Sequence, residues 1–202
     1  MQQLSAIPGY KINEYKVVLV PQEDMNHKIL NVRKYFNEKY KVEQPVGSLP
    51  EVALVTFKQL QMAEERIINR LKLIAMASHP VKVEIKDFGS FPSHSVFLNV
   101  TSKVPLGELS KKIRQDAQRI MKLDNDNRPH FLTDFYFIIA RRLKPWQYEK
   151  GWLDVSHKSF TGKFIATRML LLRRPAGEFK YRPIASFDFE NLPVETVQGN
   201  LF

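Results

Sequence analysis

Apolar and polar residues follow one another along this chain with two periods, which predicts a mixture of strands and helices. Short apolar runs at 15–21 (YKVVLVP) and 51–57 (EVALVTF) indicate strands, and strict alternation over 81–88 is typical of a half-exposed strand. Spacings of three and four residues indicate amphipathic helices. The first such stripe is Met25, Ile29, Val32 and Phe36, the second is Met62, Ile67, Ile68, Leu71 and Ile74, and the third is Leu106, Leu109, Ile113, Ala117 and Ile120.

The other elements complete a regular order. We expect strands over 96–100, 134–142, 164–174 and 181–189, a helix over 144–156 with Pro145 in its first turn, and polar loops at 42–50 and 124–129. This order predicts an α+β fold with mostly antiparallel sheets, as one two-lobed domain over 1–190 and a tail over 191–202. The helix and two strands after 51–57 resemble those after 134–142. An internal duplication explains this likeness, and so does coincidence; we favour duplication.

The charge of the chain is uneven and changes the picture of its partners. The formal net charge is +10, and between Arg141 and Arg182 eleven lysines and arginines stand against three acidic residues. A basic segment of this kind favours polyanionic partners such as nucleic acid or phosphorylated ligands. A solvated basic face without a partner has the same composition, so charge alone does not choose between them.

Several functional classes are excluded or disfavoured by composition. The chain has no cysteine, which excludes disulfides, thiolate metal sites and a cysteine nucleophile. No segment resembles a secretory signal or an apolar membrane span, so we expect a monomeric, soluble, cytoplasmic protein without a membrane partner. The phosphate-binding glycine loops and the serine elbow motif are missing. His27, His79, His94 and His157 show no metal-ligand spacing, so we expect neither a metal nor a cofactor.

The segments YKVVLVP, LPEVALVTF, VEIKDFGSFPSHSVFLNV, PLGELSKKIRQ, DFYFIIARR and FIATRMLLLRR follow one another between about Tyr15 and Phe189. In this order they resemble the 2H phosphoesterase superfamily, which includes the bacterial 2′-5′ RNA ligases and cyclic phosphodiesterases. The resemblance implies two lobes with antiparallel sheets and flanking helices. It also implies two motifs of histidine, an apolar residue, and threonine or serine. In such enzymes one histidine is the general base and the other the general acid, and the hydroxyls hold the phosphate.

This sequence departs from the superfamily pattern in both motifs. After Pro50, the first motif has Glu51 at the histidine position and Ala53 at the hydroxyl position. In the family mechanism both proton-transfer groups are histidines, so a carboxylate at this position replaces one of the two groups that transfer protons. Glu51 serves as a base only if burial raises its pKa, and it repels phosphate unless a cation such as Arg141 or a nearby lysine pairs with it.

The second motif of the superfamily typically ends in alanine and arginine, which match residues 140 and 141. Counting back places Tyr136 at its histidine position and Ile138 at its hydroxyl position. We therefore predict that Glu51 and Tyr136 face each other across a central cleft, with Ala53 and Ile138 beside them and Arg141 near its mouth.

His130 offers a rival alignment, because RPHF echoes the proline-histidine pair of the superfamily. However, the threonine after it is three residues away, and in a regular strand positions 130 and 133 face opposite sides. We expect His130 to lie on the loop that enters the strand at 134–142, and we keep it as a candidate ligand-binding residue.

Three functions are compatible with the sequence. The first is a protein related to 2′-5′ RNA ligases that binds RNA ends, a nucleotide or another phosphorylated ligand with impaired catalysis. The second is an active cyclic phosphodiesterase with a rebuilt site of Glu51 and Tyr136, with or without His130. The third is a scaffold for protein interactions. The sequence favours the first over the second, because the groups that transfer protons are replaced, and each positioned acid or base contributes roughly 10²–10⁴ in rate.

Overall fold

The computed structural model describes residues 9–43 and 48–192 of the chain. Its strands and helices, in chain order, are β1 (Ile12–Leu19), α1 (Glu23–Tyr40), β2 (Val52–Leu60), the short 3-10 turn η2 (Gln61–Ala63), α2 (Glu64–Met76), β3 (Val81–Phe91), β4 (Ser95–Val100), α3 (Lys103–Met121), β5 (His130–Phe131), β6 (Tyr136–Arg141), α4 (Pro145–Val155), β7 (Thr161–Ala166), β8 (Arg168–Pro175) and β9 (Arg182–Asp188).

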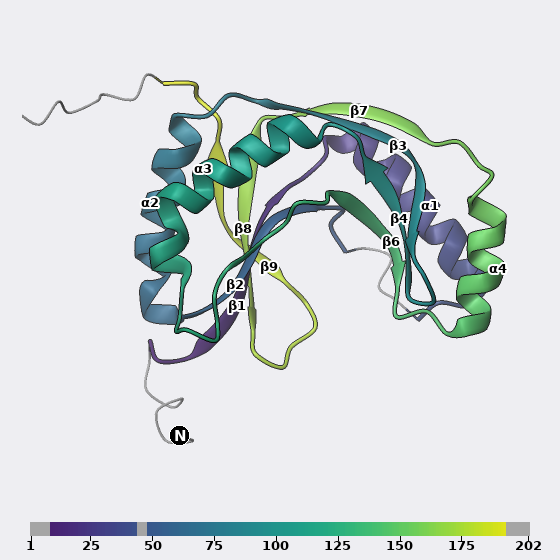
Figure 1. The fold of residues 1–202 in the computed structure, drawn as a ribbon, viewed down its shortest axis with the longest axis horizontal. Coiled ribbons are helices and arrows are strands. Elements are labelled where there is room, and N and C mark those ends of the chain that lie inside the picture. Colours follow the sequence, from purple (N-terminus) through teal and green to yellow (C-terminus); the bar gives the residue numbers. More distant parts are fainter. Residues whose placement is uncertain (1–8, 44–47, 193–202) are drawn as a thin grey trace, which may run out of the picture.

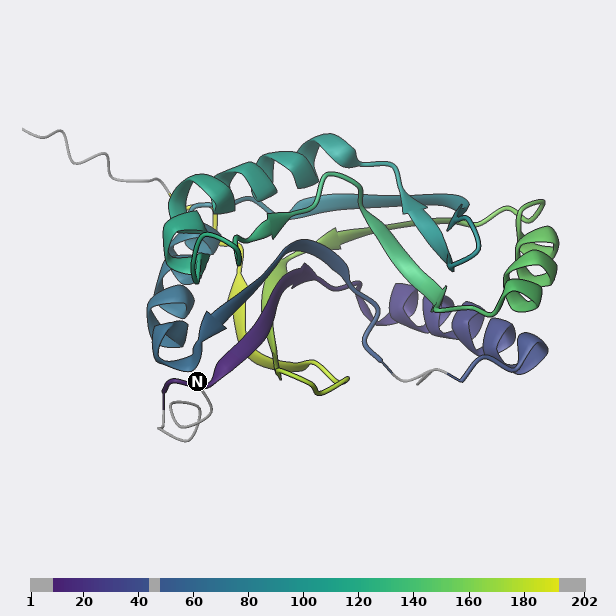
Figure 2. The ribbon, with the colours of Figure 1, turned by 60° about the horizontal axis from the view of Figure 1, so that its bottom comes forward.

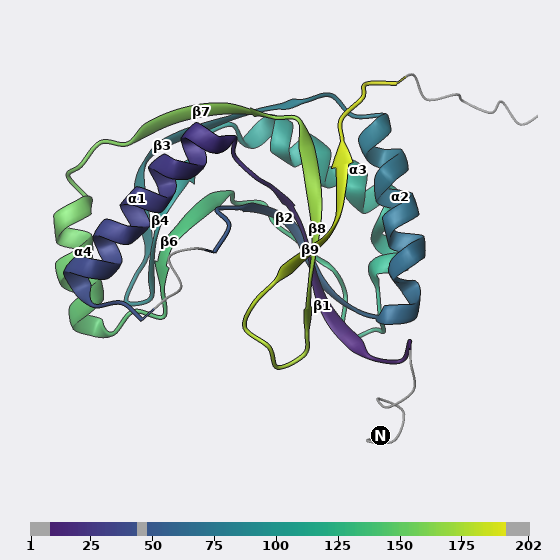
Figure 3. The same ribbon diagram turned by 180° about the vertical axis from the view of Figure 1, so that it is seen from behind.

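These strands form two antiparallel sheets, each covered by helices on one face. Sheet A has the order β5-β2-β1-β8-β9 and packs against α2 and α3 (Figure 1). Sheet B has the order β6-β4-β3-β7 and packs against α1 and α4, which lie at the opposite end of the molecule (Figure 3). The predicted α+β fold with two lobes is therefore confirmed, whereas the internal duplication and the limits of the domain stay predictions.

The predicted helical stripes form the core, with one exception. Met25, Ile29 and Phe36 of α1 are buried against sheet B, as an amphipathic helix requires. Met62 is predicted on the buried side of the second helix, but its side chain is 60% exposed. It lies in η2, before α2 begins, and so it does not share the face of the helix that follows.

The apolar run at 164–174 is predicted as one strand and is instead two strands in different sheets. Phe164 and Ala166 of β7 are buried in sheet B, whereas Met169 and Leu171 of β8 are buried in sheet A. The buried residues Phe164 and Ala166 are two positions apart, but the next buried residue, Met169, is three positions further on. The spacing changes because the chain passes from one sheet to the other at the exposed Thr167. The β8–β9 connection then projects from sheet A, as the yellow-green loop in Figure 2 shows.

The end of the described chain is attached to the end of α2. The Asn191 backbone N–H donates to the Ser78 carbonyl, and the Leu192 N–H donates to the Met76 carbonyl at 2.7 Å. The rest of the predicted tail, residues 193–202, lies outside the described residues, as do residues 44–47 of the predicted loop at 42–50. None of the described helices has the length and apolar character that a membrane span requires.

Candidate functional site

Sheet A has one face that none of the described helices covers, which we call the open face of sheet A. Val18 of β1 pairs with Ala53 of β2 and Leu170 of β8, and these side chains form a small apolar cluster separate from the main core. Tyr15 and Val17 point to the helix-covered side and are fully buried. Ala53, the predicted hydroxyl position of the first motif, therefore carries a methyl group on the open face.

Glu51 lies immediately before β2 and forms an ion pair on the same face. Lys16 Nζ donates a hydrogen bond to Glu51 Oε1 at 2.8 Å, and both side chains are about one-fifth exposed. The same ammonium group lies 4.3 Å from the centre of the Tyr181 ring, in a cation–π arrangement. The cation that pairs with Glu51 is therefore Lys16 of β1.

Tyr181 connects this ion pair to a second one at the β8–β9 hairpin. The Arg174 guanidinium also lies against the Tyr181 ring, 4.6 Å from its centre, and Arg174 Nε donates to Glu14 Oε2 at 2.8 Å. The Tyr181 hydroxyl donates to the same carboxylate oxygen at 3.3 Å. Burial is the largest effect on the Tyr181 phenol and raises its pKa to about 12. The open face of sheet A is thus lined by paired charges around a neutral tyrosine.

The face of sheet B that lies away from α1, which we call the open face of sheet B, carries a cluster of aromatic rings. Tyr136 and Ile138 are two positions apart on β6, so both side chains lie on this face. The centre of the Tyr136 ring lies 4.9 Å from that of Phe97 and 5.3 Å from that of Phe91. Burial among these rings, with a further contribution from Asp134, raises the pKa of the Tyr136 phenol. Tyr136 is therefore a neutral hydroxyl at physiological pH and can donate a hydrogen bond without losing its proton.

Arg33 of α1 connects the two predicted motif regions. Its Nε donates to the Ile138 carbonyl at 2.8 Å, and its Nη1 donates to the Ser48 carbonyl at 2.6 Å. Burial lowers the pKa of its guanidinium to about 10; the charge of Glu51 opposes this effect and that of Arg141 adds to it. Arg33 thus contacts the backbone of Ile138 and interacts electrostatically with Glu51 and Arg141. Strands β2 and β6 also contact each other directly.

His130 forms β5 with Phe131, so the prediction that it lies on a loop is wrong. This short strand pairs with β2, and His130 lies opposite Thr56 on the open face of sheet A. The cause is the burial of Phe131 in the core, together with the hydrogen bond from the Leu132 N–H to the Leu54 carbonyl at 2.9 Å. His130 and Tyr136 consequently belong to different sheets.

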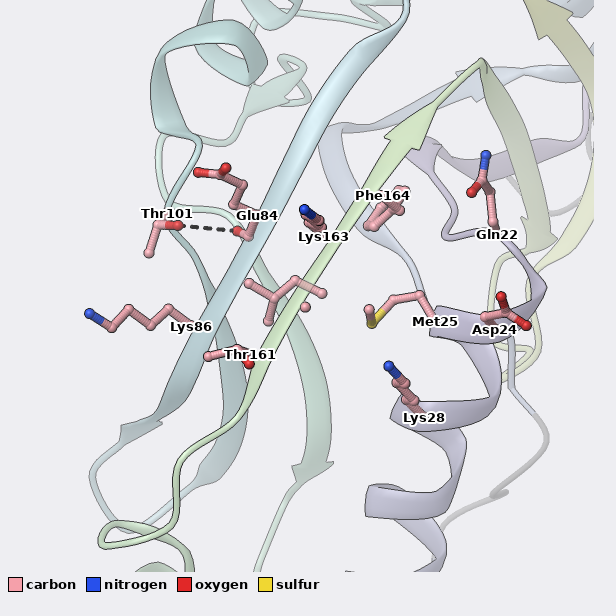
Figure 4. Close-up of a pocket in the computed structure, with 12 residues that line it drawn as sticks. Gln22, Asp24, Met25, Lys28, Glu84, Lys86, Thr101, Thr161, Lys163 and Phe164 are labelled. Atoms are coloured by element: carbon pink, nitrogen blue, oxygen red, sulfur yellow. Dashed lines mark hydrogen bonds between the residues drawn. The ribbon is translucent and has the colours of Figure 1, made fainter.

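Two pockets in the described part of the chain flank sheet B. One, of about 480 Å³, includes Tyr136, Phe91, Phe97 and Asn99 in its lining, and Glu51 is not part of it. The other, of about 600 Å³, lies between the first turn of α1 and strands β3 and β7, as Figure 4 shows. The positive charges of its lysines nearly equal the negative charges of its acidic residues. None of the candidate site residues predicted from the sequence lines this pocket.

Sequence reasoning missed Lys16 and Arg33. Both carry a recognisable signal, because Lys16 interrupts an apolar strand and Arg33 falls four residues after Ile29 on the buried side of α1. Charged side chains at such positions are rarely buried without a partner. Among the residues that the structure describes, no cluster of three or more histidine, aspartate or glutamate side chains could hold a metal ion.

Comparison with known proteins depends entirely on structure. No protein-family profile and no curated protein sequence matches this chain. Among solved structures, apo LigT of E. coli superposes with a TM-score of 0.59 at 12% identity, covering 88% of this chain and 98% of LigT. The chain has the LigT fold.

Two further structures agree with this result. TT0787 of Thermus thermophilus has a TM-score of 0.59 at 11% identity, over 88% of this chain and 98% of that protein. E. coli LigT complexed with 3′-AMP has a TM-score of 0.56 at 13% identity, over 89% and 98%. The resemblance to the 2H phosphoesterases is therefore confirmed at the level of the LigT fold, and the equivalence of Glu51, Ala53, Tyr136 and Ile138 to the motif positions stays a prediction.

Proposed function

We propose that this protein is a 2H phosphoesterase-like binding protein that holds an RNA end or another nucleotide phosphate between its two sheets without fast phosphodiester hydrolysis. The observation that carries the proposal is the chemistry at the two predicted proton-transfer positions. Glu51 is held in an ion pair by Lys16, and Tyr136 is a neutral phenol within an aromatic cluster.

Proton transfer by Tyr136 is disfavoured. An efficient general acid or base has a pKa near the working pH, and a phenol whose pKa is raised above its ordinary value of about 10 is poorly matched to that role. The two hydroxyl positions also lack hydroxyls, since they carry the side chains of Ala53 and Ile138. Four groups of the superfamily mechanism are therefore absent together.

Phosphate binding is still supported by the charges that remain. Lys16 pairs with Glu51, and the buried Arg33 interacts with the charges of both Glu51 and Arg141, so two cations act on this carboxylate and a third lies close to Arg33. The Tyr136 hydroxyl adds a neutral hydrogen-bond donor. LigT, which shares the fold, has a crystal structure complexed with 3′-AMP. These features support a phosphorylated ligand, and the basic segment between Arg141 and Arg182 supports an RNA strand attached to it.

The test is phosphorus NMR of a short RNA that ends in a 2′,3′-cyclic phosphate, titrated with near-stoichiometric protein. We expect the cyclic phosphate signal to shift or broaden and not to convert to a monoester. Binding should weaken steeply as salt rises, because each neutralised phosphate releases counterions. A matched control is Lys72→Ala on the exposed side of α2, which should leave the titration unchanged.

Two other outcomes separate the remaining functions. Conversion to a monoester that Glu51→Ala or Tyr136→Ala abolishes would overturn the proposal and establish a rebuilt active site. An unchanged spectrum at low salt would also overturn it and favour a protein-interaction scaffold.

A further inference from the structure

The pocket beside Tyr136 has the size and lining of a small-molecule site. Its volume of about 480 Å³ falls within the usual range for ligand pockets. It forms where β3 bulges between Ile85 and Phe88, so that the pairing with β4 is interrupted. Its lining residues are Lys86, Asp87, Phe91, Phe97, Asn99, Val100, Thr101, Lys103, Asp134, Phe135 and Tyr136.

One wall of this pocket is a cluster of three aromatic rings. The Phe91 and Phe97 rings are 4.7 Å apart, and the Phe91 and Tyr136 rings meet edge to face at 78°. Phe97 is buried, but Phe91 is 42% exposed although it is packed against two other rings. An exposed, supported aromatic ring is a stacking platform for a flat ligand such as a nucleobase.

The positions of Phe97 and Asn99 in the pocket lining depend on Gly89. A Cβ atom on Gly89 would lie 2.6 Å from Asn99 Oδ1 and 2.4 Å from Phe97 Cε2, so only glycine leaves room for both side chains. Asn99 lines the pocket and is partly exposed. Its side chain offers a donor pair and an acceptor, which is the complement of a base edge.

Of the two lysines that line the pocket, Lys103 is paired with an acid and Lys86 is available to bind an anion. Lys103 Nζ forms an ion pair with Asp134 at 2.9 Å, and Asp87 accepts a hydrogen bond from the Phe160 N–H at 3.2 Å. Lys86 lines the same pocket, and no ion pair is formed by its ammonium group within residues 9–43 and 48–192. The pocket therefore combines stacking and amide recognition with only weak attraction for phosphate.

We propose that this pocket binds the base of a nucleotide, which stacks on the exposed Phe91 ring and hydrogen-bonds to the Asn99 side chain. The inference rests on the proposed function, because it supplies a base subsite next to the region where we place the phosphate. It names the ligand class as nucleotides and RNA ends, in contrast to phosphorylated molecules without a base.

The experiment compares adenosine 5′-monophosphate with ribose 5-phosphate, which lacks the base, by isothermal titration calorimetry. Stacking and base recognition should make the adenosine compound bind at least about fivefold more tightly. Phe91→Ala and Asn99→Ala should each remove most of this difference. Phe179→Ala is the matched control, because Phe179 is 79% exposed in the β8–β9 connection and is not part of the pocket lining.

The failures of the two proposals are distinguishable. Equal binding of both compounds, or a difference that survives Phe91→Ala and Asn99→Ala, would overturn the base pocket and leave phosphate binding intact. Lack of binding by both compounds and by the cyclic-phosphate RNA would overturn the proposed function as well. If Phe91→Ala reduces folding, as circular dichroism would show, Asn99→Ala alone decides the base pocket.

Discussion

The Arg33 guanidinium of α1 donates a hydrogen bond to the backbone carbonyl of Ile138 on β6, 2.8 Å away. This contact joins a helix of the first third of the chain to the strand that carries the second predicted motif. Arg33 is 7% exposed and also holds the Ser48 carbonyl just before the first motif. One buried cation therefore holds the backbone at both predicted motif regions.

We predict that Arg33→Met lowers the free energy of unfolding by about 1–3 kcal/mol, because two carbonyl groups lose a charged donor while most of the volume is kept. Urea denaturation measures this change. The control is Lys34→Met, the neighbouring residue with a side chain 65% exposed, which should change stability by less than about 0.5 kcal/mol. Equal stability of Arg33→Met and the parent would show that the contact contributes nothing.

The Lys16–Glu51 pair predicts a compensating double substitution. Lys16→Ala leaves an unpaired carboxylate beside the proposed phosphate position, and we expect the cyclic-phosphate RNA to bind about tenfold more weakly or worse. Lys16→Ala combined with Glu51→Ala should recover part of the loss, because the repulsion is removed. The affinities are measured by phosphorus NMR titration. If the effects of Lys16→Ala and Glu51→Ala on RNA affinity simply add, the phosphate does not bind beside this ion pair.

Restoring the superfamily residues should restore catalysis if the motif positions are correct. We predict that Glu51→His, Ala53→Thr, Tyr136→His and Ile138→Thr together raise hydrolysis of the cyclic-phosphate RNA by at least about 100-fold over the parent protein. Ala53→Thr with Ile138→Thr is the control and should stay near the parent rate, because it supplies no acid or base. A folded fourfold variant without activity would contradict the alignment of the two motifs.

Asp154 of α4 collects hydrogen bonds from several side chains and predicts a pH dependence of stability. The Tyr35 and Tyr40 hydroxyls and the Lys39 ammonium group of α1 donate to its Oδ2, and Lys158 pairs with its Oδ1. Burial pushes the pKa of Asp154 upward, but these donors outweigh burial and hold the pKa below its ordinary value. The stability that this carboxylate contributes is therefore complete above its unfolded pKa and is lost as pH falls through the folded one.

We accordingly expect Asp154→Asn to be less stable than the parent at about pH 7, with a difference that narrows as pH falls from about 4 toward 2. Urea denaturation across this pH range measures the difference. Asp116→Asn, an exposed acid on α3, serves as the comparison and should show no such narrowing beyond the parent trend. A difference independent of pH would mean that the donors do not recognise the charge of Asp154.

Two glycines in helices predict stability changes of opposite sign. A Cβ atom at Gly151 of α4 would lie 2.4 Å from Phe36 Cζ, whereas at Gly107 of α3 it would meet nothing within 4 Å. Alanine favours the helix by about 0.5–1 kcal/mol at both sites, but overpacking against the fully buried Phe36 costs about 1–3 kcal/mol. Gly107→Ala should therefore stabilise the protein and Gly151→Ala should destabilise it, as thermal unfolding would show. Shifts of the same sign would contradict the α1–α4 packing.

The local pattern was sufficient to predict most elements of this protein. The stripes at Met25, Ile29 and Phe36 and the alternation over 81–88 are set by which side chains must leave water, and this information is present within each segment. The same reasoning placed Tyr136 and Ile138 on one face of a strand. The ordered set of segments also predicted the two-lobed fold that the structure shows.

Only the tertiary structure decided how segments distant in sequence meet. The run at 164–174 has the pattern of a single strand, and its division between two sheets depends on partners that the run itself does not contain. His130 joined sheet A because Phe131 is buried in the core beside β2. Lys16 at Glu51, Arg33 at Ile138 and Asn99 beside Tyr136 are contacts between separate elements, and contacts of this kind follow from packing and not from the period of any one segment.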